Sequence, residues 1–522
     1  MEPRGPVGVP SDFRAIDATI LADRWDVGEI EAGSFGFLDE RRDLGNPVRW
    51  DPDDATQLWL FHLHYWEWAW SLAAHPDQDR ARSTFASQWR SWSDQTTFGR
   101  WNAWAPYPVS LRAWVLLNTF DRLVAGGDLE DSMVAALGLH AGFLQRHIEL
   151  DIGGNHVIKN LKALVGLGAF LHDDDLIDLG LEHLDREVEK QVLADGGHFE
   201  LSPSYHCQVL ADFVDISNLL RSSGHEPVPA LDDAVHRMRC WLGSMRTPEG
   251  GVPLFNDCEP VSDELIDLLQ PGPAATEGLT VLEPSGYVIV RRGPLHLIAD
   301  VGQPGPSSPP GHIHADCLSF VLYVHGEPVV VDSGTSEYGS GPRRQHERST
   351  AAHNTVEVDG IDQTEVWGAF RAGRRTRATL ERAEISDHAV VITASHDGYR
   401  HLPGSPVHRR TWTVSESAVA ITDEVVGTGH HRISSRLHVP ETALVAPVTD
   451  DRPLDPPPRI RSVELSFGDV GAPAGAEQHP STVWRRGFVA RGFGRLLPAV
   501  TVTNEREVEL PAVVTTTIDV VS

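Results

Sequence analysis

The sequence has few of the features that mark nucleic-acid-binding, membrane-spanning or disulfide-rich proteins. Lysine is nearly absent, so the positive charge is almost all arginine, and the formal net charge is −30. Because phosphate binding needs clustered Lys and Arg, this composition disfavours a nucleic-acid partner. No apolar run approaches the length that crosses a bilayer, so we expect no membrane partner. The 4 cysteines are scattered without CxxC spacing, which favours reduced, buried thiols over a disulfide scaffold.

The stretch MEPRGPVGVPSDFRAID at the start has no apolar core of the kind that secretory signals contain. We therefore expect a cytoplasmic protein, with prior removal of a leader as the alternative. A length of 522 residues is too great for one ordinary hydrophobic core, so the chain should form two or three domains. A homo-oligomer is compatible with the sequence, which does not define the oligomeric state.

The periodicity of apolar residues divides the chain into three parts. Residues 1–50 show little periodicity and are expected to be an N-terminal extension. Residues 51–272 contain successive amphipathic helical segments joined by short Gly/Pro loops, which predicts an all-α domain of helical hairpins. A turn-rich linker, PGPAATEG, leads to residues 273–522, where short strand-like segments alternate with hairpin turns. These features predict an antiparallel β-sandwich.

Three histidines and an aspartate in the β region are spaced so that a subset of them could bind a metal. His312 and His314 are two residues apart in a strand-like stretch, so both side chains should face the same space. Asp332 ends a run of valines and His353 opens the next apolar run, where side chains at strand ends can converge. Two imidazoles and one carboxylate are a suitable ligand set for zinc. Polar surface histidines are the alternative, and spacing alone does not decide between the two interpretations.

Three side chains in the helical part are candidates for substrate binding. Tyr65 lies in the aromatic-rich segment TQLWLFHLHYWEWAWSLAAH, and aromatic faces suit pyranose rings. Trp104 and Arg112 flank a turn before a helix that should begin near Ser110, a good N-cap residue. The guanidinium of Arg112 is a candidate for binding a carboxylate. A buried helix is the alternative for most of the aromatic residues, and a surface charge is the alternative for Arg112.

Five sequence blocks carry a resemblance to a known family: GGNHVIKNLKAL, DGGHFELSPSYHCQVLADF, GHIHAD, VVVDSGT and STAAHNTVEVDG. In this order they resemble the heparinase II/III-like polysaccharide lyases, over most of the chain from about Trp59 onward. The resemblance implies an incomplete N-terminal (α/α) toroid, a C-terminal antiparallel β-sandwich and a substrate cleft between these domains. It also implies β-elimination on a uronic-acid-containing polysaccharide or oligosaccharide, which leaves a 4,5-unsaturated uronate end.

The resemblance assigns catalytic roles to four residues. Asn155 matches the amide that binds the uronate carboxylate, and the neighbouring His156 is a second candidate for this role. Tyr205 matches the tyrosine that acts as base, acid or both, and His312 matches the catalytic histidine of the second domain. A helix cap is the alternative role for Asn155, and packing inside the toroid is the alternative for Tyr205.

The resemblance also implies a metal cofactor. His314, Asp332 and His353 match the metal ligands of the zinc-containing members of the family. We therefore expect a structural divalent metal, zinc, that holds the strands presenting His312.

Two further charged residues are candidates for contact with the substrate. Glu200 lies in the same block as Tyr205 and should orient this tyrosine or bind sugar hydroxyls. Arg348 forms a charge run with Arg343 and Arg344, where an acidic substrate would need cations. A solvated surface is the alternative for this run.

The expected function is that of a polysaccharide lyase, with an anionic uronate-containing polysaccharide or oligosaccharide as its partner. The acidic composition and the lack of a secretory signal favour an unsulfated or lightly charged substrate over heparin. A glycoside hydrolase on a helical toroid is the first alternative, with Asp195 and Glu200 as paired carboxylates. A non-catalytic carbohydrate-binding protein is the second. Elimination is favoured because Asn, Tyr and His, rather than two acids, occupy the motif positions.

Overall fold

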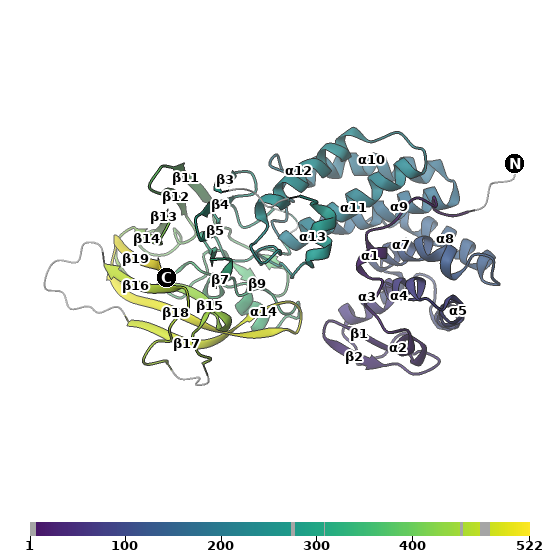
Figure 1. Cartoon of the computed structure of the whole chain (residues 1–522), viewed down its shortest axis with the longest axis horizontal. Coiled ribbons are helices and arrows are strands. Elements are labelled where there is room, and N and C mark those ends of the chain that lie inside the picture. The colour runs from purple at the N-terminus through teal and green to yellow at the C-terminus, as the bar shows by residue number, and fades with distance from the viewer. Residues whose placement is uncertain are drawn as a thin grey trace. The chain divides into compact units, whose positions relative to one another are not determined.

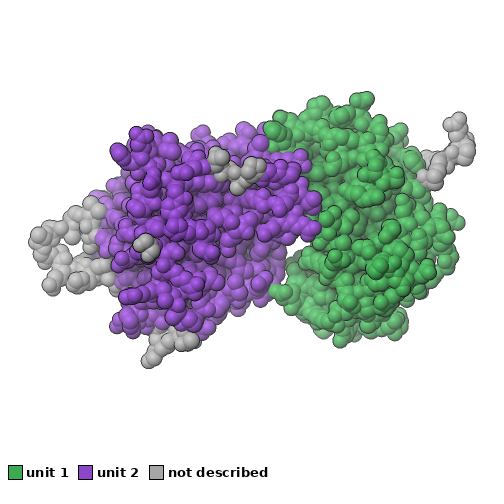
Figure 2. All heavy atoms as spheres, viewed as in Figure 1, with its two compact units in different colours: residues 1–191, 208–236 green, residues 192–207, 237–522 purple. Residues whose placement is uncertain are grey.

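The chain forms a helical region followed by a region of antiparallel strands, which confirms the predicted fold class (Figure 1). The computed structural model describes residues 7–272, 277–306, 308, 310–448, 453–469 and 481–521. It divides into two compact units, coloured separately in Figure 2. Unit 1 contains Met1–Gln191 and Gln208–His236, and unit 2 contains Val192–Cys207 and Arg237–Ser522. Two helices, α11 (Pro203–Ser222) and α12 (Pro229–Met245), have residues in both units.

These units divide the chain at other residues than the sequence suggested. The predicted boundary at residue 273 lies outside the described residues. The expected N-terminal extension contains regular elements of unit 1, namely α1 (Asp17–Ile20), α2 (Val27–Ala32), β1 (Ser34–Phe37) and β2 (Glu40–Asp43). β1 pairs with β2 as a hairpin and contacts α2 and α3 (Gln57–Tyr65). Each element is too short to show a clear apolar period, which is why the sequence did not reveal them.

The other helices of unit 1 form a packed bundle. They are α4 (Ala69–Ala74), α5 (Gln78–Gln95), α6 (Trp101–Trp104), α7 (Pro106–Leu123), α8 (Glu130–Leu144), α9 (Gly154–Leu171) and α10 (Asp174–Gln191). α9 packs against α7, α8 and α10 and is buried along almost its whole length, as expected of a helix that is apolar on most sides. No helix in the described ranges is both long and apolar enough to span a bilayer.

Helix α7 begins at Pro106, so the predicted start near Ser110 is wrong. Its N-cap residue, Ala105, makes no side-chain capping bond, and proline occupies the first turn. Proline has no backbone N–H, but this costs no helical hydrogen bond in the first turn, because first-turn N–H groups lack a partner within the helix. Ser110 instead donates its hydroxyl to the carbonyl of Pro106 at 2.9 Å.

Aromatic rings fill the core of unit 1. Trp66 lies 4.5 Å from Trp68 and 5.8 Å from Trp50 between ring centroids, and all three side chains are buried. Such contacts add specific ring-to-ring attraction to the large apolar area that each ring removes from water. The tryptophan excess of this segment therefore serves mainly to build a core, as the buried-helix interpretation proposed.

A buried network of charges joins α9 to α11 within unit 1. The ammonium of Lys162 contacts Asp215 at 2.7 Å and Asp212 at 2.9 Å, and Lys159 also contacts Asp212 at 2.8 Å. Burial raises the pKa of Asp215 to about 6, against the opposing charge of Lys162. Two of the few lysines in the chain are thus held in ion pairs inside the helical unit.

The described part of unit 2 contains three larger antiparallel sheets and a short pair, β9 (Val366–Trp367) with β10 (Arg371–Ala372). In spatial order, the six-stranded sheet is β11 (Ala378–Ile385), β12 (Val390–His396), β13 (Val407–Val414), β14 (Ala418–Val426), β19 (Ala512–Val520) and β16 (Val463–Asp469). The four-stranded sheet is β17 (Ser481–Ala490), β18 (Leu496–Glu509), β15 (His430–Pro440) and β8 (Val356–Val358). The five-stranded sheet is β3 (Gly278–Leu282), β4 (Tyr287–Arg292), β5 (Leu295–Asp300), β6 (Phe320–Val324) and β7 (Glu327–Val330). Two short helices, α13 (Asp263–Leu269) and α14 (Pro342–Glu347), lie in the loops.

One apolar core joins these three sheets. Along β13 and β14 buried residues alternate with half-buried ones, so each strand has one buried face. Trp412 and Ile421 on these faces belong to the same core as Leu297 of β5 and Val502 of β18. The alternation is typical of antiparallel sheets with one packed face, as the sequence predicted.

A buried polar network links the six-stranded sheet to the loops that carry the candidate site. Arg410 donates through Nε to Asp423 at 2.6 Å, and Nε2 of His408 donates to the same carboxylate at 2.7 Å. Arg410 also donates to the backbone carbonyls of Leu318 and Asn354. The six-stranded sheet therefore holds the backbone at Leu318, shortly after His314, and at Asn354, directly after His353.

Candidate active site

Tyr205 and His312 lie together in unit 2. Tyr205 is in the first turn of α11, and His312 is in the loop between β5 and β6. Their ring centroids are 4.1 Å apart with an interplanar angle of 32°. The hydroxyl of Tyr205 is 3.0 Å from the hydroxyl of a second tyrosine, Tyr338. The two side chains that the sequence blocks singled out for proton transfer are thus in direct contact.

Asp257 is the centre of this cluster. Its fully buried carboxylate accepts from Nδ1 of His312 at 3.0 Å and from Nε2 of His314 at 2.8 Å. Arg344 donates to both carboxylate oxygens, through Nη2 to Oδ2 at 2.6 Å and through Nη1 to Oδ1. Thr335 adds a hydroxyl donor at 3.2 Å. A buried carboxylate with this many donors is held in its charged form and fixes the orientation of both imidazoles.

The electrostatics of the cluster follow from these contacts. Burial would raise the pKa of Asp257, but the Arg344 charge and the two histidine donors hold it well below its usual value. Burial would lower the pKa of His312, but the bond to Asp257 and the negative charge of Glu200 raise it above its ordinary value. Burial raises the pKa of Tyr338 well above that of a free phenol. His312 is therefore biased toward its protonated form, and Tyr338 keeps its proton.

The predicted strand around His312 and His314 is a loop, so that expectation is wrong. Even so, both imidazoles reach the same carboxylate, as the spacing of two residues suggested. The loop is held by the backbone N–H of His314, which donates to Asn256, and by Arg348, which donates through Nε and Nη2 to the carbonyl of Ile313 at 3.0 and 2.9 Å. Because Arg348 is fully buried and donates to backbone carbonyls, it positions this loop.

The three residues expected to bind metal also lie together in unit 2. Nδ1 of His353 donates to Oδ2 of Asp332 at 2.9 Å, and the rings of His314 and His353 are 5.2 Å apart. Nδ1 of His314 and Nε2 of His353 are buried without a hydrogen-bond partner among the described residues. In that same part of the chain, no group of three or more His, Cys, Asp or Glu side chains is arranged to hold a metal ion. The donor chemistry fits a metal, and the arrangement of three ligands is not shown.

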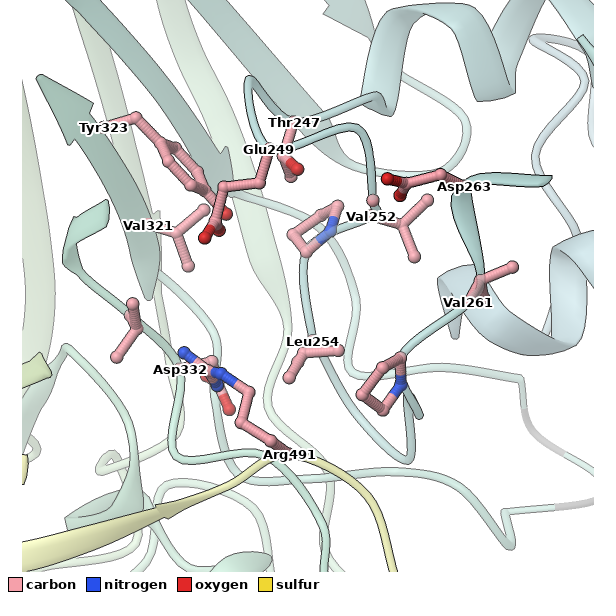
Figure 3. Close-up of a pocket in the computed structure, with 14 residues that line it drawn as sticks. Thr247, Glu249, Val252, Leu254, Val261, Asp263, Val321, Tyr323, Asp332 and Arg491 are labelled. Atoms are coloured by element: carbon pink, nitrogen blue, oxygen red, sulfur yellow. The ribbon is translucent and has the colours of Figure 1, made fainter. Parts of the chain in front are cut away.

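Asp332 also lines a cavity of about 240 Å³ in unit 2 (Figure 3). Glu249, Tyr323 and Arg491 are among the other lining residues. The cavity combines three carboxylates, a phenol and a guanidinium with valine and proline side chains. Its mixture of charges favours no single class of ligand.

Asn155 and His156 lie at the start of α9 in unit 1. The N-cap of α9 is Gly153 and makes no side-chain capping bond, so the alternative that Asn155 caps this helix is wrong. Asn155 is buried and donates through Nδ2 to Oε1 of Gln208 at 3.0 Å. Nδ1 of His156 is 3.2 Å from Glu149, and part of the His156 ring is exposed. Both side chains have polar partners that fix their orientation.

Tyr65, Trp104 and Arg112 are buried in unit 1. Arg112 is fully buried and lies over the rings of Trp92 and Trp104, at 4.7 and 5.4 Å. It donates to His140 and to the backbone carbonyl of His64, both at 3.0 Å. These contacts are those of core residues.

Glu200 is almost fully buried, and its carboxylate lies 3.8 Å from Nδ1 of His198 in unit 2. Its charge contributes to the raised pKa of His312, as described above. Glu200 thus affects the cluster through its charge. Asp195, its partner in the hydrolase alternative, accepts from the backbone and hydroxyl of Ser285, at 2.9 and 2.7 Å.

Sequence reasoning missed Asp257 and Tyr338. Both lie in loops outside any periodic segment, Asp257 in PLFNDCEP and Tyr338 in SEYGSG. The available signals were weak: an adjacent Asn–Asp pair after an apolar run, and one of only 7 tyrosines placed in a glycine-rich loop. Neither pattern predicts a contact with His312.

Comparison with known proteins agrees with the fold. The Heparinase II/III N-terminus profile matches residues 35–270, and the Heparinase II/III-like, C-terminal profile matches residues 274–465. The chain therefore belongs to the heparinase II/III-like family.

Two curated relatives match this chain over more than two thirds of its length. The chain is 24% identical over 440 residues to the heparin-sulfate lyase of Pedobacter heparinus, which covers 75% of this chain and 63% of that protein. It is 26% identical over 375 residues to FtsZ-localized protein C of Caulobacter vibrioides, covering 69% of this chain and 63% of that protein. The chain thus spans under two thirds of the length of each.

Solved structures share the fold. A crystal structure of heparinase III aligns with a TM-score of 0.79 and 17% identity, covering 99% of this chain and 88% of that chain. The heparan sulfate lyase of Pedobacter heparinus aligns with a TM-score of 0.64 and 18% identity, covering 100% and 85%. At these identities the likeness concerns the fold.

Proposed function

We propose that this protein is a polysaccharide lyase that cleaves a uronic-acid-containing polysaccharide or oligosaccharide by β-elimination. The observation that carries the proposal is the contact between Tyr205 and His312, with His312 oriented by the buried carboxylate of Asp257. Membership of the heparinase II/III-like family and the lyase names of several relatives support it.

The reaction requires three steps on the substrate. The uronate carboxylate must be neutralised so that the proton on C5 becomes acidic, a base must remove this proton, and an acid must protonate the leaving oxygen on C4. The C5–H electrons form the C4–C5 double bond as the C4–O bond breaks. No water is consumed, and the product is a 4,5-unsaturated uronate end.

We assign these steps to the residues of the matching blocks. Asn155 neutralises the carboxylate with its amide, and His156 is the second candidate for this role. Tyr205 removes the C5 proton and returns it to the leaving oxygen. This assignment requires a phenol that can lose its proton, although a free phenol has a pKa near 10.

Two neighbours support deprotonation of Tyr205. Tyr338 keeps its own proton and can donate it in a hydrogen bond to a Tyr205 phenolate. His312, biased toward the imidazolium form by Asp257, stabilises negative charge next to it. Because Nδ1 of His312 is bound to Asp257, Nε2 is the nitrogen left to act on substrate.

The proposal is tested by incubating the protein with heparin, heparan sulfate, hyaluronan, alginate and glucuronan. We expect the ultraviolet absorbance of the enoate to rise with at least one unsulfated or lightly charged substrate. Tyr205→Phe and His312→Ala should lose this signal while still binding the substrate. New reducing ends without ultraviolet absorbance would instead establish a hydrolase.

We further propose that His314, Asp332 and His353 hold a structural divalent metal, with zinc as the ion that best suits two imidazoles and a carboxylate. The support is the pair of buried ring nitrogens without partners, one on His314 and one on His353. Each imidazole uses its other nitrogen on a carboxylate, a common feature of metal-binding histidines. When bound, the metal would fix the loop that carries His312.

Metal content and thermal stability test this second proposal independently of activity. Protein purified from zinc-supplemented medium should contain stoichiometric zinc by mass spectrometry, and a chelator should lower its melting temperature. His353→Gln should lose both effects. A metal-free protein with an unchanged melting temperature would refute the proposal.

A further inference from the structure

A second pocket in unit 2 contains none of the residues assigned to the reaction. Its volume is about 260 Å³, and it is lined by Ser333, Arg343, His346, Glu347, His438, Gly487, Phe488, Ala490, Leu496 and Thr501. Helix α14 supplies Arg343 and His346, and strands β17 and β18 supply the last five residues. At roughly 30 Å³ for each molecule of liquid water, this space corresponds to about nine waters, which leaves room for one small polar ligand.

The pocket holds one arginine, Arg343, in a strongly acidic chain. Arg343 makes no hydrogen bond or ion pair with the described residues, and Arg343 and His346 are neighbours on α14, one turn apart. The one carboxylate in the wall, Glu347, is already bound to Ser336 through the backbone N–H at 3.0 Å and through the hydroxyl. Arg343 is therefore left without a direct ion-pair partner among the described residues, which favours an anionic ligand. Burial and the charges of His353 and Arg436 lower the pKa of His346, so its imidazole serves as a neutral hydrogen-bond donor.

One wall of the pocket has a polar group without a partner. The hydroxyl of Ser333 is buried, the residue is 6% exposed, and the hydroxyl has no hydrogen-bond partner among the described residues. Buried polar groups are normally paired, so this hydroxyl is suited to a hydroxyl of a ligand. His438 adds an acceptor, because its Nδ1 donates to Asn354 at 3.1 Å and leaves Nε2 with a lone pair.

An exposed aromatic ring completes the lining. Phe488 is 56% exposed, and the guanidinium of Arg486 lies 5.8 Å from its ring centroid, which leaves the opposite face of the ring for a ligand. An aromatic face beside hydrogen-bonding groups suits the apolar face of a pyranose ring.

We propose that this pocket is a second carbohydrate site that binds one acidic sugar unit. The acidic group contacts Arg343 and His346, the sugar hydroxyls bond to Ser333 and His438, and the ring face covers Phe488. The proposal rests on the proposed function only for the choice of a uronate as this sugar. The site would retain an anionic chain on unit 2 without taking part in its cleavage.

Titration of the full chain with D-glucuronate, glucose, N-acetylglucosamine 6-sulfate and sodium sulfate, followed by ligand-observed NMR, tests the proposal. D-glucuronate should bind, and Arg343→Ala should weaken this binding event about tenfold, the effect of losing one charge-assisted hydrogen bond. Arg382→Ala is the matched control, because Arg382 is an exposed arginine of the same unit, paired with Glu384. Its binding should equal that of the wild type. Tighter binding of the sulfated sugar than of glucuronate would identify sulfate as the acidic group and would overturn the uronate assignment.

Two further variants separate a binding site from a structural cavity. Ser333→Ala should weaken glucuronate binding severalfold while the melting temperature stays the same or rises, because an unpaired buried hydroxyl is removed. Phe488→Ala should weaken the binding of glucuronate but not of inorganic sulfate. Equal affinity for glucose and glucuronate, or unchanged affinity in Arg343→Ala, would overturn the proposal. These measurements need no turnover, so a protein without lyase activity could still bind here, and an active lyase could fail to bind.

Discussion

The hydroxyl oxygens of Tyr205 and Tyr338 lie 3.0 Å apart, within hydrogen-bonding distance. Because burial raises the pKa of Tyr338 well above its ordinary value, Tyr338 is the donor whenever Tyr205 carries negative charge. Tyr338 itself touches the guanidinium of Arg344, which lies 5.0 Å from the ring centroid. The second tyrosine therefore links the proposed base to the Asp257 ion pair.

Tyr338→Phe removes only this hydroxyl and should lower kcat by about ten- to a hundredfold, since a hydrogen bond to a charged group contributes ~1.5–3 kcal/mol. KM should change little. The limb of the pH–rate profile that reports Tyr205 should move to higher pH, because the phenolate loses a donor. Initial rates followed by enoate absorbance measure both effects. Tyr323→Phe, at another buried tyrosine of unit 2, should leave both unchanged.

Arg344→Met should lower the free energy of unfolding by about 3–5 kcal/mol, because it leaves the buried carboxylate of Asp257 without its charge partner. Denaturant unfolding measures the loss. Arg382→Met removes an exposed arginine from its pair with Glu384 and should cost less than about 1 kcal/mol. Equal losses in the two variants would contradict the role given to the buried pair.

Asp423 should make the sandwich unit sensitive to acid. Burial would raise its pKa, but the Arg410 charge and the His408 donor hold it far below the ordinary value. A depressed pKa contributes stability that is present above the unfolded value near 3.9 and is lost as the pH falls toward the folded value. Asp423→Asn should therefore be less stable than the wild type at pH 7 by about 3–5 kcal/mol, with a smaller difference below pH 4. Urea unfolding across this pH range measures the trend, and Asp387→Asn, at an exposed aspartate, should follow the wild type.

Arg112→Met separates packing from substrate binding. Arg112 is fully buried against Trp92 and Trp104, so its loss should lower the melting temperature while KM for the uronate substrate stays within error. Thermal unfolding and steady-state kinetics on the same preparation measure the two quantities. A large rise in KM at unchanged stability would restore the carboxylate-binding role that the sequence suggested.

The fold was predictable from the sequence because its signals are long and periodic. The helical period of residues 154–171 and the alternation along residues 407–426 both extend over many residues and agree with α9, β13 and β14. The start of α7 was not predictable in this way, because prolines can either break a helix or open one, and local sequence does not distinguish the two.

The candidate site was predictable only in part. The sequence blocks named Tyr205 and His312, and the structure brings these side chains together. Asp257 could not be inferred, since it lies 55 residues before His312 and reaches it through a fold contact that no spacing rule describes. Likewise, Arg348 and Arg112 are buried by residues that lie far away in the sequence. The charge run around Arg348 and the helix start near Arg112 both suggested exposed side chains, whereas the structure buries both.

The ion pairs of Lys159 and Lys162 have a practical consequence for chemical labelling. Their ammonium groups are enclosed at 11% and 4% side-chain exposure, whereas Lys190 is 47% exposed. Amine-directed dyes, tethers or cross-linkers should therefore react at Lys190 before any other lysine. A reporter could be attached there, on the helical unit, without modifying a side chain of the catalytic cluster.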